Sequence, residues 1–478
     1  MEIKDKLRNF LEIPYDQLEQ MNTKAAQKAQ TMTSEELEVE YRTYLKKEKR
    51  IKAVTICFSD IEGRFHMLDY DKNFLLDSAD NLTFDGSSIR GFSSLKESDL
   101  RLQIDWSSLR HLPSDIFGPG KIILFAFILT SDKKPHPSDF RSMLKIYSEE
   151  LLKTKEVKGL VSAEVEGFVV DGIEAEENYS IHKGFELISS GGYYHSLPLD
   201  KLKVFIDKAA EAQRAMAFNN EKDHPEVAPS QFELNFSYSE ALLACDKIQL
   251  YKLTCRQIAA NMGMTATFLP KPIPGINGSG MHLNFSIQKK NKNIFFDKNG
   301  KDLLSKTAWD SISKLLNHAQ EISLILNSSV NSYRRLDPNF EAPNQIKVSS
   351  KDRGSMIRIP TFNEKTARVE VRSVAPDSNP YLVVFTILKT IHEGQSLVKE
   401  ENKRERLRYL PGNIGDAIKF FRSSDFTTKI FGEETKSKYI NFKQASADRS
   451  PKELGIKVKR SEIIYHHEIT NQMLWNDF

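Results

Sequence analysis

The first part of the chain passes from a polar helical stretch to short apolar runs. Residues 1–50 are rich in Lys, Glu and Gln, and Leu37, Tyr41 and Leu45 recur at helical spacing, which predicts a solvated N-terminal helical extension. Between residues 51 and 130, turn-rich segments separate short apolar runs. These runs, AVTICF, FHMLDY and IILFAFIL, predict the strands of a small, strand-dominated domain.

The polar stretch 130–139 carries two prolines and precedes a helical pattern, so we place a domain boundary there. Residues 131–478 then alternate long helical patterns with short strand-like segments, which predicts a large α+β domain. The helical patterns cover 202–217, 239–262, 303–326 and 381–398. The stretch QKKNKNIFFDKNGK predicts an exposed hairpin whose turn is KNG.

Composition indicates an ordinary globular protein. Of 478 residues, 40% are hydrophobic and 28% charged, and 68 Lys and Arg against 65 Asp and Glu give a net charge of +3. This charge is too small and too dispersed to favour nucleic acid or a membrane surface as a partner. The three cysteines form no CxxC, the start lacks an apolar signal region, and the longest apolar run is far shorter than a membrane span. We therefore expect reduced thiols and a cytoplasmic protein.

Several strand-like segments of the second domain carry polar side chains on one face. Alternate residues of a strand share a face, so Glu164 and Glu166, which flank Val165, point the same way. Glu226 lies seven residues before Glu233. The other alternating sets are Glu233 with Asn235, His282 with Asn284 and Ser286, and Arg368 with Glu370 and Arg372.

Together, these segments indicate a metal and phosphate site. A lone Glu-x-Glu is typical of a solvated strand face, but several Glu and one His would repel or be desolvated at large cost unless cations lay among them. Such donors suit Mg²⁺ or Mn²⁺, and arginines beside them suit a phosphate or carboxylate. The glycines of NGSGMH allow close backbone approach beside His282, where Asn277 can bond a polar group. The chain has no P-loop, Rossmann, GxSxG or HExxH motif.

Seven motifs carry a family resemblance. They are FDGSSIRGF (84–92), SAEVEGF (162–168), HPEVAPSQFE (224–233), NGSGMH (277–282), NSYRRLDPNFEAP (331–343), DRGSMIRIP (352–360) and ARVEVRSVAPDSNPY (367–381). Their order and spacing resemble those of the type I glutamine synthetases of bacteria and archaea. The resemblance implies a β-grasp domain at 51–130 and a large catalytic α/β domain whose antiparallel sheet forms the active-site funnel. It also implies ATP-dependent joining of glutamate and ammonia through γ-glutamyl phosphate.

The resemblance also implies a role for each matching position. Two or three Mg²⁺ or Mn²⁺ ions would be held, one by Glu166, Glu226 and Glu233 and a second by Glu164, His282 and Glu370. Glutamate would contact Asn277, Gly278, Arg335 and Arg372, and ATP would contact Glu221, Ser286, Arg358 and Arg368, with Arg353 and Arg368 near the transferring phosphoryl group. Ammonium would lie between Glu341, on a mobile flap, and Asp85 with Ser88 of a neighbouring subunit. The implied assembly is a homo-oligomer, a dodecamer of two hexameric rings.

The chain departs from the family pattern at Asn284, Val348 and Asp352, where His, Trp and Asn are usual. In the short, charged segment 397–410 we identify no counterpart of the tyrosine that some members adenylylate, so we expect no regulation by that modification. Two alternatives stay open. A γ-glutamyl-amine ligase of the same superfamily would remodel the ammonium pocket, which Asp85, Ser88 and Glu341 argue against. A non-catalytic structural relative would lose the metal residues, and all six are present.

Overall fold

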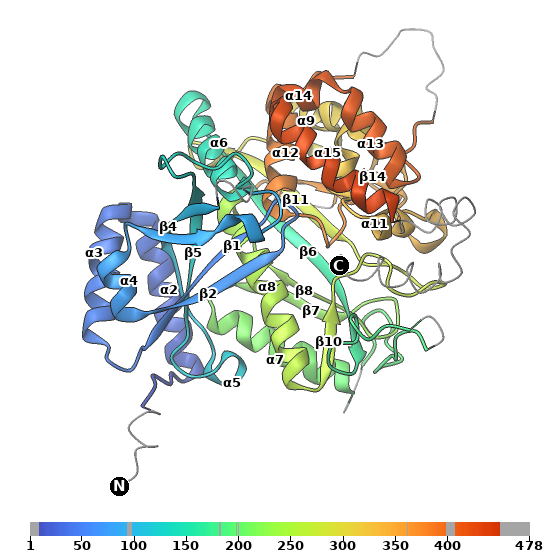
Figure 1. The fold of residues 1–478 in the computed structure, drawn as a ribbon. Helices are drawn as coiled ribbons and strands as arrows, with labels where there is room; N and C mark the ends of the chain where they lie inside the picture. The colour runs from blue at the N-terminus through green and yellow to red at the C-terminus, as the bar shows by residue number, and fades with distance from the viewer. Residues whose placement is uncertain are drawn as a thin grey trace, which may run out of the picture.

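The computed structural model of the chain describes residues 9–92, 98–180, 183–196, 198, 200–360, 362–397 and 407–449. It has a smaller lobe, formed by the segments up to Leu129, and a larger lobe formed by the rest (Figure 1). The segment 398–406, where much of the search for an adenylylated tyrosine falls, lies outside the described residues. No described helix combines the length and apolar character needed to cross a bilayer.

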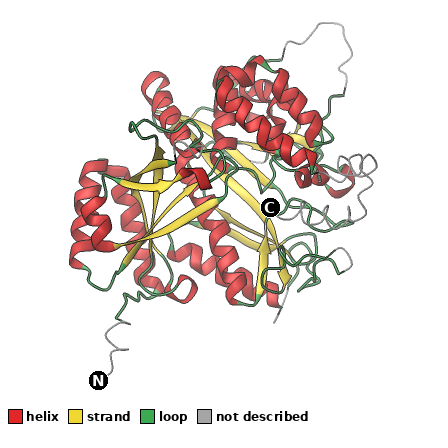
Figure 2. Cartoon of the chain, viewed as in Figure 1, coloured by secondary structure: helices red, strands yellow, loops and turns green. Residues whose placement is uncertain are grey.

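The smaller lobe contains a five-stranded sheet with helices packed against it (Figure 2). The strand order is β2-β1-β5-β4-β3, with β1 and β5 parallel and the other pairs antiparallel. The strands are β1 (Ala53–Ser59), β2 (Phe65–Asp71), β3 (Leu82–Asp85), β4 (Asp99–His111) and β5 (Ile122–Leu129). The apolar runs correctly predict β1, β2 and β5. Short helices are α4 (Lys72–Ser78), α5 (Ser114–Phe117) and a 3₁₀ turn (Gly86–Ser88).

Two helices precede this sheet, α2 (Tyr15–Thr31) and α3 (Ser34–Lys47). Helix α3 begins at a capping box, in which the Thr33 hydroxyl accepts from the Glu36 N–H and the Glu36 carboxylate accepts from the Thr33 N–H. Leu37, Tyr41 and Leu45 form its buried face, as their spacing predicts.

Helix α2 forms within the predicted helical extension, and one of its faces, which carries Leu18, Asn22 and Ala25, is buried. The side chain of Asn22 is completely buried and donates to the carbonyl oxygens of His111 in β4 (2.9 Å) and Ala215 in α7 (2.8 Å). The His111 N–H donates back to the Asn22 Oδ1 at 2.9 Å. The helix therefore bridges the two lobes. The sequence does not reveal this contact, because nothing distinguishes this Asn from its solvated neighbours.

The larger lobe contains a ten-stranded sheet. Its main path is β13-β14-β15-β11-β6-β8-β7, with β9 and β10 pairing with β6 and β12 pairing with β11. Every pair is antiparallel except β13 with β14. The strands are β6 (Val157–Asp171), β7 (Asn220–Pro225), β8 (Gln231–Phe236), β9 (Ser239–Glu240), β10 (Met264–Thr267), β11 (Met281–Lys289), β12 (Lys292–Asn293), β13 (Gln345–Ser349), β14 (Ser355–Arg358) and β15 (Val369–Val371).

Helices surround this sheet, and the last of them gather into one group, shown in orange and red in Figure 1. They are α6 (Phe140–Lys155), α7 (Lys201–Ala215), α8 (Ala241–Asn261), α9 (Lys306–Asn317), α10 (Ala319–Leu326), α11 (Val330–Arg335), α12 (Pro380–Glu393), α13 (Ile414–Ser423), α14 (Asp425–Phe431) and α15 (Glu433–Asp448), with 3₁₀ turns at Lys301–Leu303 and Pro338–Phe340. The α+β class predicted from the sequence is confirmed.

Two of the predicted helices have different bounds. The pattern at 303–326 forms α9 and α10, separated at His318, whose Nδ1 lies 2.8 Å from Glu321 and whose Nε2 accepts from the Gln395 N–H. The pattern at 381–398 forms α12, which ends at Glu393 because Gly394 takes an extended backbone conformation.

The hairpin predicted in the Lys- and Asn-rich stretch forms, but its turn is not KNG. Cross-strand pairing of Lys289 with Lys292 leaves Lys290 and Asn291 as a two-residue turn. Both have positive φ, 47° and 60°, which a type I′ turn requires to match the twist of the strands. The KNG segment forms a separate turn, in which the Gly300 N–H donates to the Asp297 carbonyl.

Arg141, at the start of α6, joins the lobes through a buried ion network. Its guanidinium donates to Asp246 of α8 at 2.9 and 2.7 Å and to Asp105 of β4 at 2.7 Å. The Tyr381 hydroxyl donates to the same Asp246 carboxylate at 2.7 Å. One cation thus neutralises a carboxylate from each lobe, and loss of either contact would leave a buried charge uncompensated.

Candidate active site

A cleft of about 370 Å³ lies along strands β6, β8, β11 and β15 of the larger lobe. Most of the residues that the sequence singles out line it. These are Glu164, Glu166, Glu226, Glu233, Asn277, Gly278, His282, Arg335, Glu341, Arg353, Arg358, Arg368, Glu370 and Arg372. Residues as far apart in the sequence as Glu164 and Arg372 meet here because antiparallel pairing brings their strand faces together.

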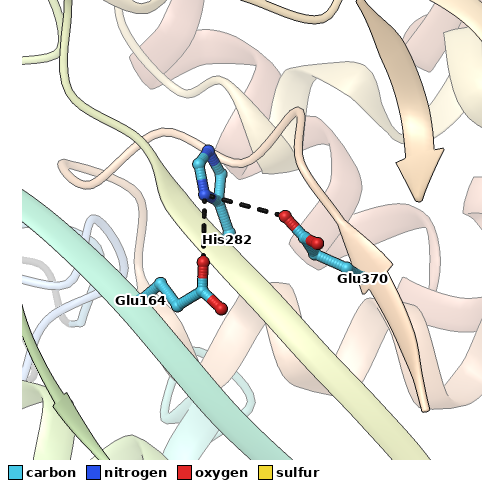
Figure 3. Close-up of side chains that lie close together, drawn as sticks. All are labelled: Glu164, His282 and Glu370. Carbon is cyan, nitrogen blue, oxygen red and sulfur yellow. Dashed lines mark ion pairs between the residues drawn. The ribbon is translucent and has the colours of Figure 1, made fainter. Parts of the chain in front are cut away.

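The first side-chain cluster in the cleft consists of Glu164, His282 and Glu370 (Figure 3). Cross-strand pairing places His282 of β11 opposite Glu164 of β6, and β15 carries Glu370 to the other side of β11. The His282 Nδ1 lies 3.5 Å from the Glu164 Oε2 and 3.8 Å from the Glu370 Oε1. One donor atom from each residue lies within 4.8 Å of the others, a spacing that one metal ion can span.

A second cluster consists of His224, Glu226 and Glu233, whose donor atoms also lie within 4.8 Å of one another. The His224 Nε2 is 3.5 Å from the Glu233 Oε1, and its Nδ1 is 3.7 Å from the Glu226 Oε1. His224 was not among the residues predicted from the sequence. The signal was present, since His224 alternates with Glu226, but the proline between them obscures the strand pattern.

Glu166 lies between the two clusters. It is the cross-strand partner of Glu233, and its Oε1 is 3.8 Å from the His282 Nε2. Its Oε2 accepts hydrogen bonds from the Gly280 N–H (2.8 Å) and the Gln231 side chain (3.3 Å). The sequence grouped Glu166 with Glu226 and Glu233, and in the structure it faces both sets.

The carboxylates crowd one another strongly. Burial raises the pKa of Glu226 to about 7, with the charge of Glu233 adding to the rise, and burial together with both neighbouring carboxylates raises the pKa of Glu166 well above its usual range. Burial alone would also raise the pKa of Glu164, but contacts with His282 and Asn284 lower it to about 2. Carboxylate oxygens and imidazoles at these spacings fit hard divalent cations such as Mg²⁺ or Mn²⁺, which would relieve the repulsion.

Arginines also line the cleft, close to the first cluster. The buried Arg335 donates to the carbonyl oxygens of Arg372 (3.0 Å) and Val374 (3.3 Å), and burial lowers its pKa to about 10. Arg358 and Arg372 both form ion pairs with Glu370, at 2.8 and 3.2 Å. These contacts hold the guanidinium groups beside the first cluster, where an anion could bind them.

Asn277, Gly278 and Glu341 also line the cleft. The Asn277 side chain donates to the Glu341 carboxylate at 3.5 Å, and Glu341 lies 3.9 Å from the Arg353 guanidinium. Gly278 is closely packed, since a Cβ at this position would approach the Pro270 carbonyl oxygen to 2.3 Å. Only glycine fits between that carbonyl and the cleft.

A second cavity, of about 730 Å³, adjoins the cleft and shares Glu164, Lys222 and Arg368 with it. Glu221 and Ser286, two of the residues expected at ATP, line this cavity, as does Asn284. Arg358 lines the cleft instead. Val348 and Asp352 line neither space, and Asp352 forms an ion pair with Lys347 at 2.6 Å.

Asp85 and Ser88 are not brought to this cleft within one chain. They lie at the end of β3 in the smaller lobe, where the Ser88 hydroxyl donates to the Asp85 carboxylate at 2.8 Å. Neither is among the described residues that line the cleft. Both are exposed.

Other cleft residues escaped the sequence analysis: Tyr193, Tyr194, Lys222, Val227, Gln231, Phe340, Ala342 and Pro360. The Tyr194 ring meets the His224 ring edge-on at 4.7 Å between centroids. Gln231 bridges the Glu166 carboxylate and the Gly278 carbonyl oxygen. Tyr193 and Tyr194 lie in a turn, where no periodic pattern marks them. Gln231 alternates with Glu233 and Asn235 on β8, a signal that the sequence analysis did not use.

Comparison with protein families then gives two matches. Residues 137–457 match the glutamine synthetase catalytic domain, and residues 50–130 match the glutamine synthetase β-grasp domain. The chain belongs to the glutamine synthetase family. It is therefore a ligase of that family, and the predicted β-grasp domain followed by a large catalytic domain is confirmed.

Individual relatives agree with this family membership. The chain is 32% identical over 425 residues to a glutamine synthetase of Thermus thermophilus, covering 84% of this chain and 93% of the relative. It is 33% identical over 418 residues to a glutamine synthetase of Staphylococcus aureus, covering 84% and 92%. A Plasmodium falciparum glutamine synthetase structure shares the fold, with a TM-score of 0.76 at 22% identity over 86% of this chain and 95% of that one. A GmaS/ADP complex gives 0.73 at 25% identity, over 85% and 95%.

Proposed function

We propose that this glutamine synthetase family member is a glutamate–ammonia ligase, which converts ATP, glutamate and ammonia to glutamine, ADP and phosphate through γ-glutamyl phosphate. The observation that carries the proposal is the pair of clusters that contain His282 and His224, whose carboxylates line one cleft together with several arginines. Such a site can bind two hard cations and two anionic substrates together, as transfer of a phosphoryl group to a carboxylate requires.

In this proposal the metal ions bind at the two clusters. Glu164, His282 and Glu370 hold one ion, and Glu226, Glu233 and Glu166 hold the other, with His224 as an added donor. The bound cations would neutralise charge on the phosphates of ATP and on the carboxylate that receives the phosphoryl group.

Glutamate binds in the cleft between Asn277, Gly278, Arg335 and Arg372. Arg335 uses some of its donors on backbone carbonyl oxygens, which fixes the guanidinium plane and leaves other N–H groups for a substrate carboxylate. The adjoining cavity receives ATP, with Glu221 and Ser286 on its wall. Arg353 and Arg358 line the cleft and Arg368 lines both spaces. These arginines stabilise the charge that spreads over the moving phosphoryl group.

Ammonia attacks the γ-carbonyl carbon of the acyl phosphate beside Glu341, and phosphate leaves as the C–N bond forms. Glu341 supplies one carboxylate that attracts ammonium and accepts its proton. Asp85, with Ser88, supplies the second from a neighbouring subunit of a homo-oligomer, which we propose to be a dodecamer of two hexameric rings. In support, Asp85 is exposed and lies outside the cleft of its own chain.

The experiment that tests the proposal measures phosphate release from ATP in the presence of glutamate, with Mg²⁺ or Mn²⁺. Ammonium is compared with methylamine, ethylamine and putrescine as the acceptor, and products are identified by mass spectrometry. Ammonium-dependent release with glutamine as the product supports the proposal. Preference for an amine would indicate a γ-glutamyl-amine ligase. If an assembled oligomer released no phosphate with any of the acceptors, the protein would be a non-catalytic relative.

The variant His282→Ala ties the activity to the cleft. Removal of a donor from the first cluster should abolish turnover while the oligomer still assembles. His66→Ala is the matched control, because His66 lies in β2 of the smaller lobe and contacts Asp60 instead of the cleft. Full activity in His282→Ala would refute the site.

A further inference from the structure

Asn284 connects the first carboxylate cluster to an arginine of the nucleotide cavity. Its Nδ2 donates to the Glu164 Oε1 at 3.0 Å, and its Oδ1 accepts from the Arg368 Nε at 3.1 Å. The side chain is only 4% exposed. One amide therefore spans the boundary between the cleft and the adjoining cavity, both of which Glu164 and Arg368 line.

The chemistry of the two neighbours fixes the orientation of this amide. A carboxylate can only accept a hydrogen bond and a guanidinium can only donate one. The amide nitrogen must therefore face Glu164 and the amide oxygen must face Arg368. An aspartate, leucine or alanine at this position could not satisfy both neighbours.

The contact also orients Glu164. Its Oε1 is held by Asn284, which leaves the Oε2 facing the His282 Nδ1 at 3.5 Å. On the other side, Arg368 also donates to the Thr366 carbonyl oxygen at 3.2 Å, so its guanidinium is held at two points. Asn284 therefore links the positions of Glu164 and Arg368. If either side chain shifts, at least one of the two Asn284 hydrogen bonds must be distorted.

A second asparagine provides an internal comparison. Asn235 of β8 donates to the Glu233 Oε1 at 2.8 Å, much as Asn284 donates to Glu164. It is equally buried, at 4% exposed, but among the described residues its Oδ1 has no hydrogen-bond partner. Asn235 therefore supports a carboxylate without linking it to an arginine.

We propose that Asn284 is a positioning residue that couples cation binding at Glu164, His282 and Glu370 to the placement of Arg368 at the nucleotide phosphates. The proposal rests on the proposed function for the identity of the nucleotide, but the coupling is a property of the metal cluster and can be measured without turnover. At a position where the family usually has His, the amide supplies a donor and an acceptor in a fixed arrangement.

The test is a double-mutant cycle read out by Mn²⁺ binding, followed by electron paramagnetic resonance of the free ion. The four proteins are the wild type, Asn284→Leu, Arg368→Met and the double variant. Groups that orient metal ligands are typically worth about 10- to 100-fold in metal affinity, so Asn284→Leu should weaken Mn²⁺ binding by roughly 10-fold or more. Removal of the Arg368 charge acts on Mn²⁺ equally in both backgrounds and cancels in the cycle.

If Asn284 links Glu164 to Arg368, the Mn²⁺ affinity of the double variant should differ by about fivefold or more from the value expected from the two single variants. The same cycle with Asn235→Leu in place of Asn284→Leu should be additive, because Asn235 has no contact with Arg368. Additive effects in the Asn284 cycle, or wild-type Mn²⁺ affinity in Asn284→Leu, would overturn the proposal. If the leucine variant does not assemble, Asn284→Ala carries the same cycle. Because no step requires glutamine formation, failure of the proposed function would leave this result standing.

Discussion

Glu166 and Glu233 are direct cross-strand partners on β6 and β8, and both point into the same cleft. Like charges opposite each other in an antiparallel pair destabilise the sheet. Burial and the charges of Glu226 and Glu233 accordingly raise the pKa of Glu166. The repulsion between these carboxylates lowers the stability of the folded protein without a cation. A bound cation would remove the repulsion, so the same arrangement favours metal binding.

We therefore expect Glu233→Gln to change the stability of the folded protein in opposite directions without and with a divalent cation. The substitution removes one charge from the repelling group, so at pH 8 and without divalent ions the variant should be more stable than the wild type by roughly 1–2 kcal/mol. In Mg²⁺ the order should reverse, because the variant loses a ligand. Thermal unfolding with EDTA and with Mg²⁺ measures both effects.

Glu149→Gln is the control for this experiment, because Glu149 is an exposed helical residue that does not line the cleft. Its unfolding temperature should respond to Mg²⁺ as that of the wild type does. A Glu233→Gln protein that is less stable in EDTA, yet still gains stability from Mg²⁺, would contradict the repulsion argument.

The strand-face pattern explains why much of the site could be predicted. Glu164, His282 and Glu370 alternate with apolar residues, and a period of two can be read directly from a sequence. Their mutual distances could not be read, because they depend on how β6, β11 and β15 pair. His224 was missed because Pro225 interrupts its strand pattern. Gln231 was missed although it alternates with Glu233 and Asn235 on β8.

The fold, like the site, has parts that the sequence predicts and parts that it does not. The runs of β1, β2 and β5 are apolar and short, so composition alone predicts them. Asn22 looks like its solvated neighbours, and only the tertiary structure makes it a bridge between His111 and Ala215. The hairpin turn shifted to Lys290 and Asn291 because register, not the presence of a glycine, decides which residues turn.

Arg141 should be among the most sensitive positions for stability. Arg141→Met leaves Asp105 and Asp246 buried without their shared cation, and loss of one member of a buried ion pair costs about 3–5 kcal/mol. Urea unfolding of the variant should show this loss.

Arg42→Met is the control, because Arg42 pairs with Glu38 on the partly exposed face of α3. This substitution should change the stability by less than about 1 kcal/mol. Similar losses in both variants would contradict the network.

His111 should make stability fall in acid. Burial, with a smaller contribution from the Arg110 charge, lowers its pKa to about 4 in the folded protein. The unfolded chain therefore binds a proton on this side chain between about pH 6.5 and pH 4 while the folded protein does not, so stability is lost as the pH falls through that window. For one such histidine, the loss between pH 7 and pH 5 is roughly 2 kcal/mol.

The measurement compares urea unfolding of the wild type and His111→Gln at pH 7 and pH 5. The variant lacks the titrating group, so its stability should change between the two pH values by about 2 kcal/mol less than that of the wild type. The substitution also removes the 2.9 Å contact between Tyr44 and the imidazole, which changes the stability at pH 7. The comparison therefore uses only the difference in stability between the two pH values. Equal pH dependence in both proteins would show that His111 does not titrate as inferred.

The separation of Asp85 from Glu341 gives a test of the assembly. If each active site takes Asp85 from one subunit and Glu341 from its neighbour, Asp85→Ala and Glu341→Ala are each inactive alone. Co-assembly in equal amounts places both intact residues in about one quarter of the sites, because each subunit of a pair is intact at the required position half of the time. Mixed oligomers should therefore recover about a quarter of wild-type activity after co-refolding or co-expression.

A mixture of Glu341→Ala with His282→Ala should recover none, because both residues lie in one cleft of one chain and every site lacks one of them. Activity restored in that second mixture, or absent from the first despite verified co-assembly, would refute an active site shared between subunits.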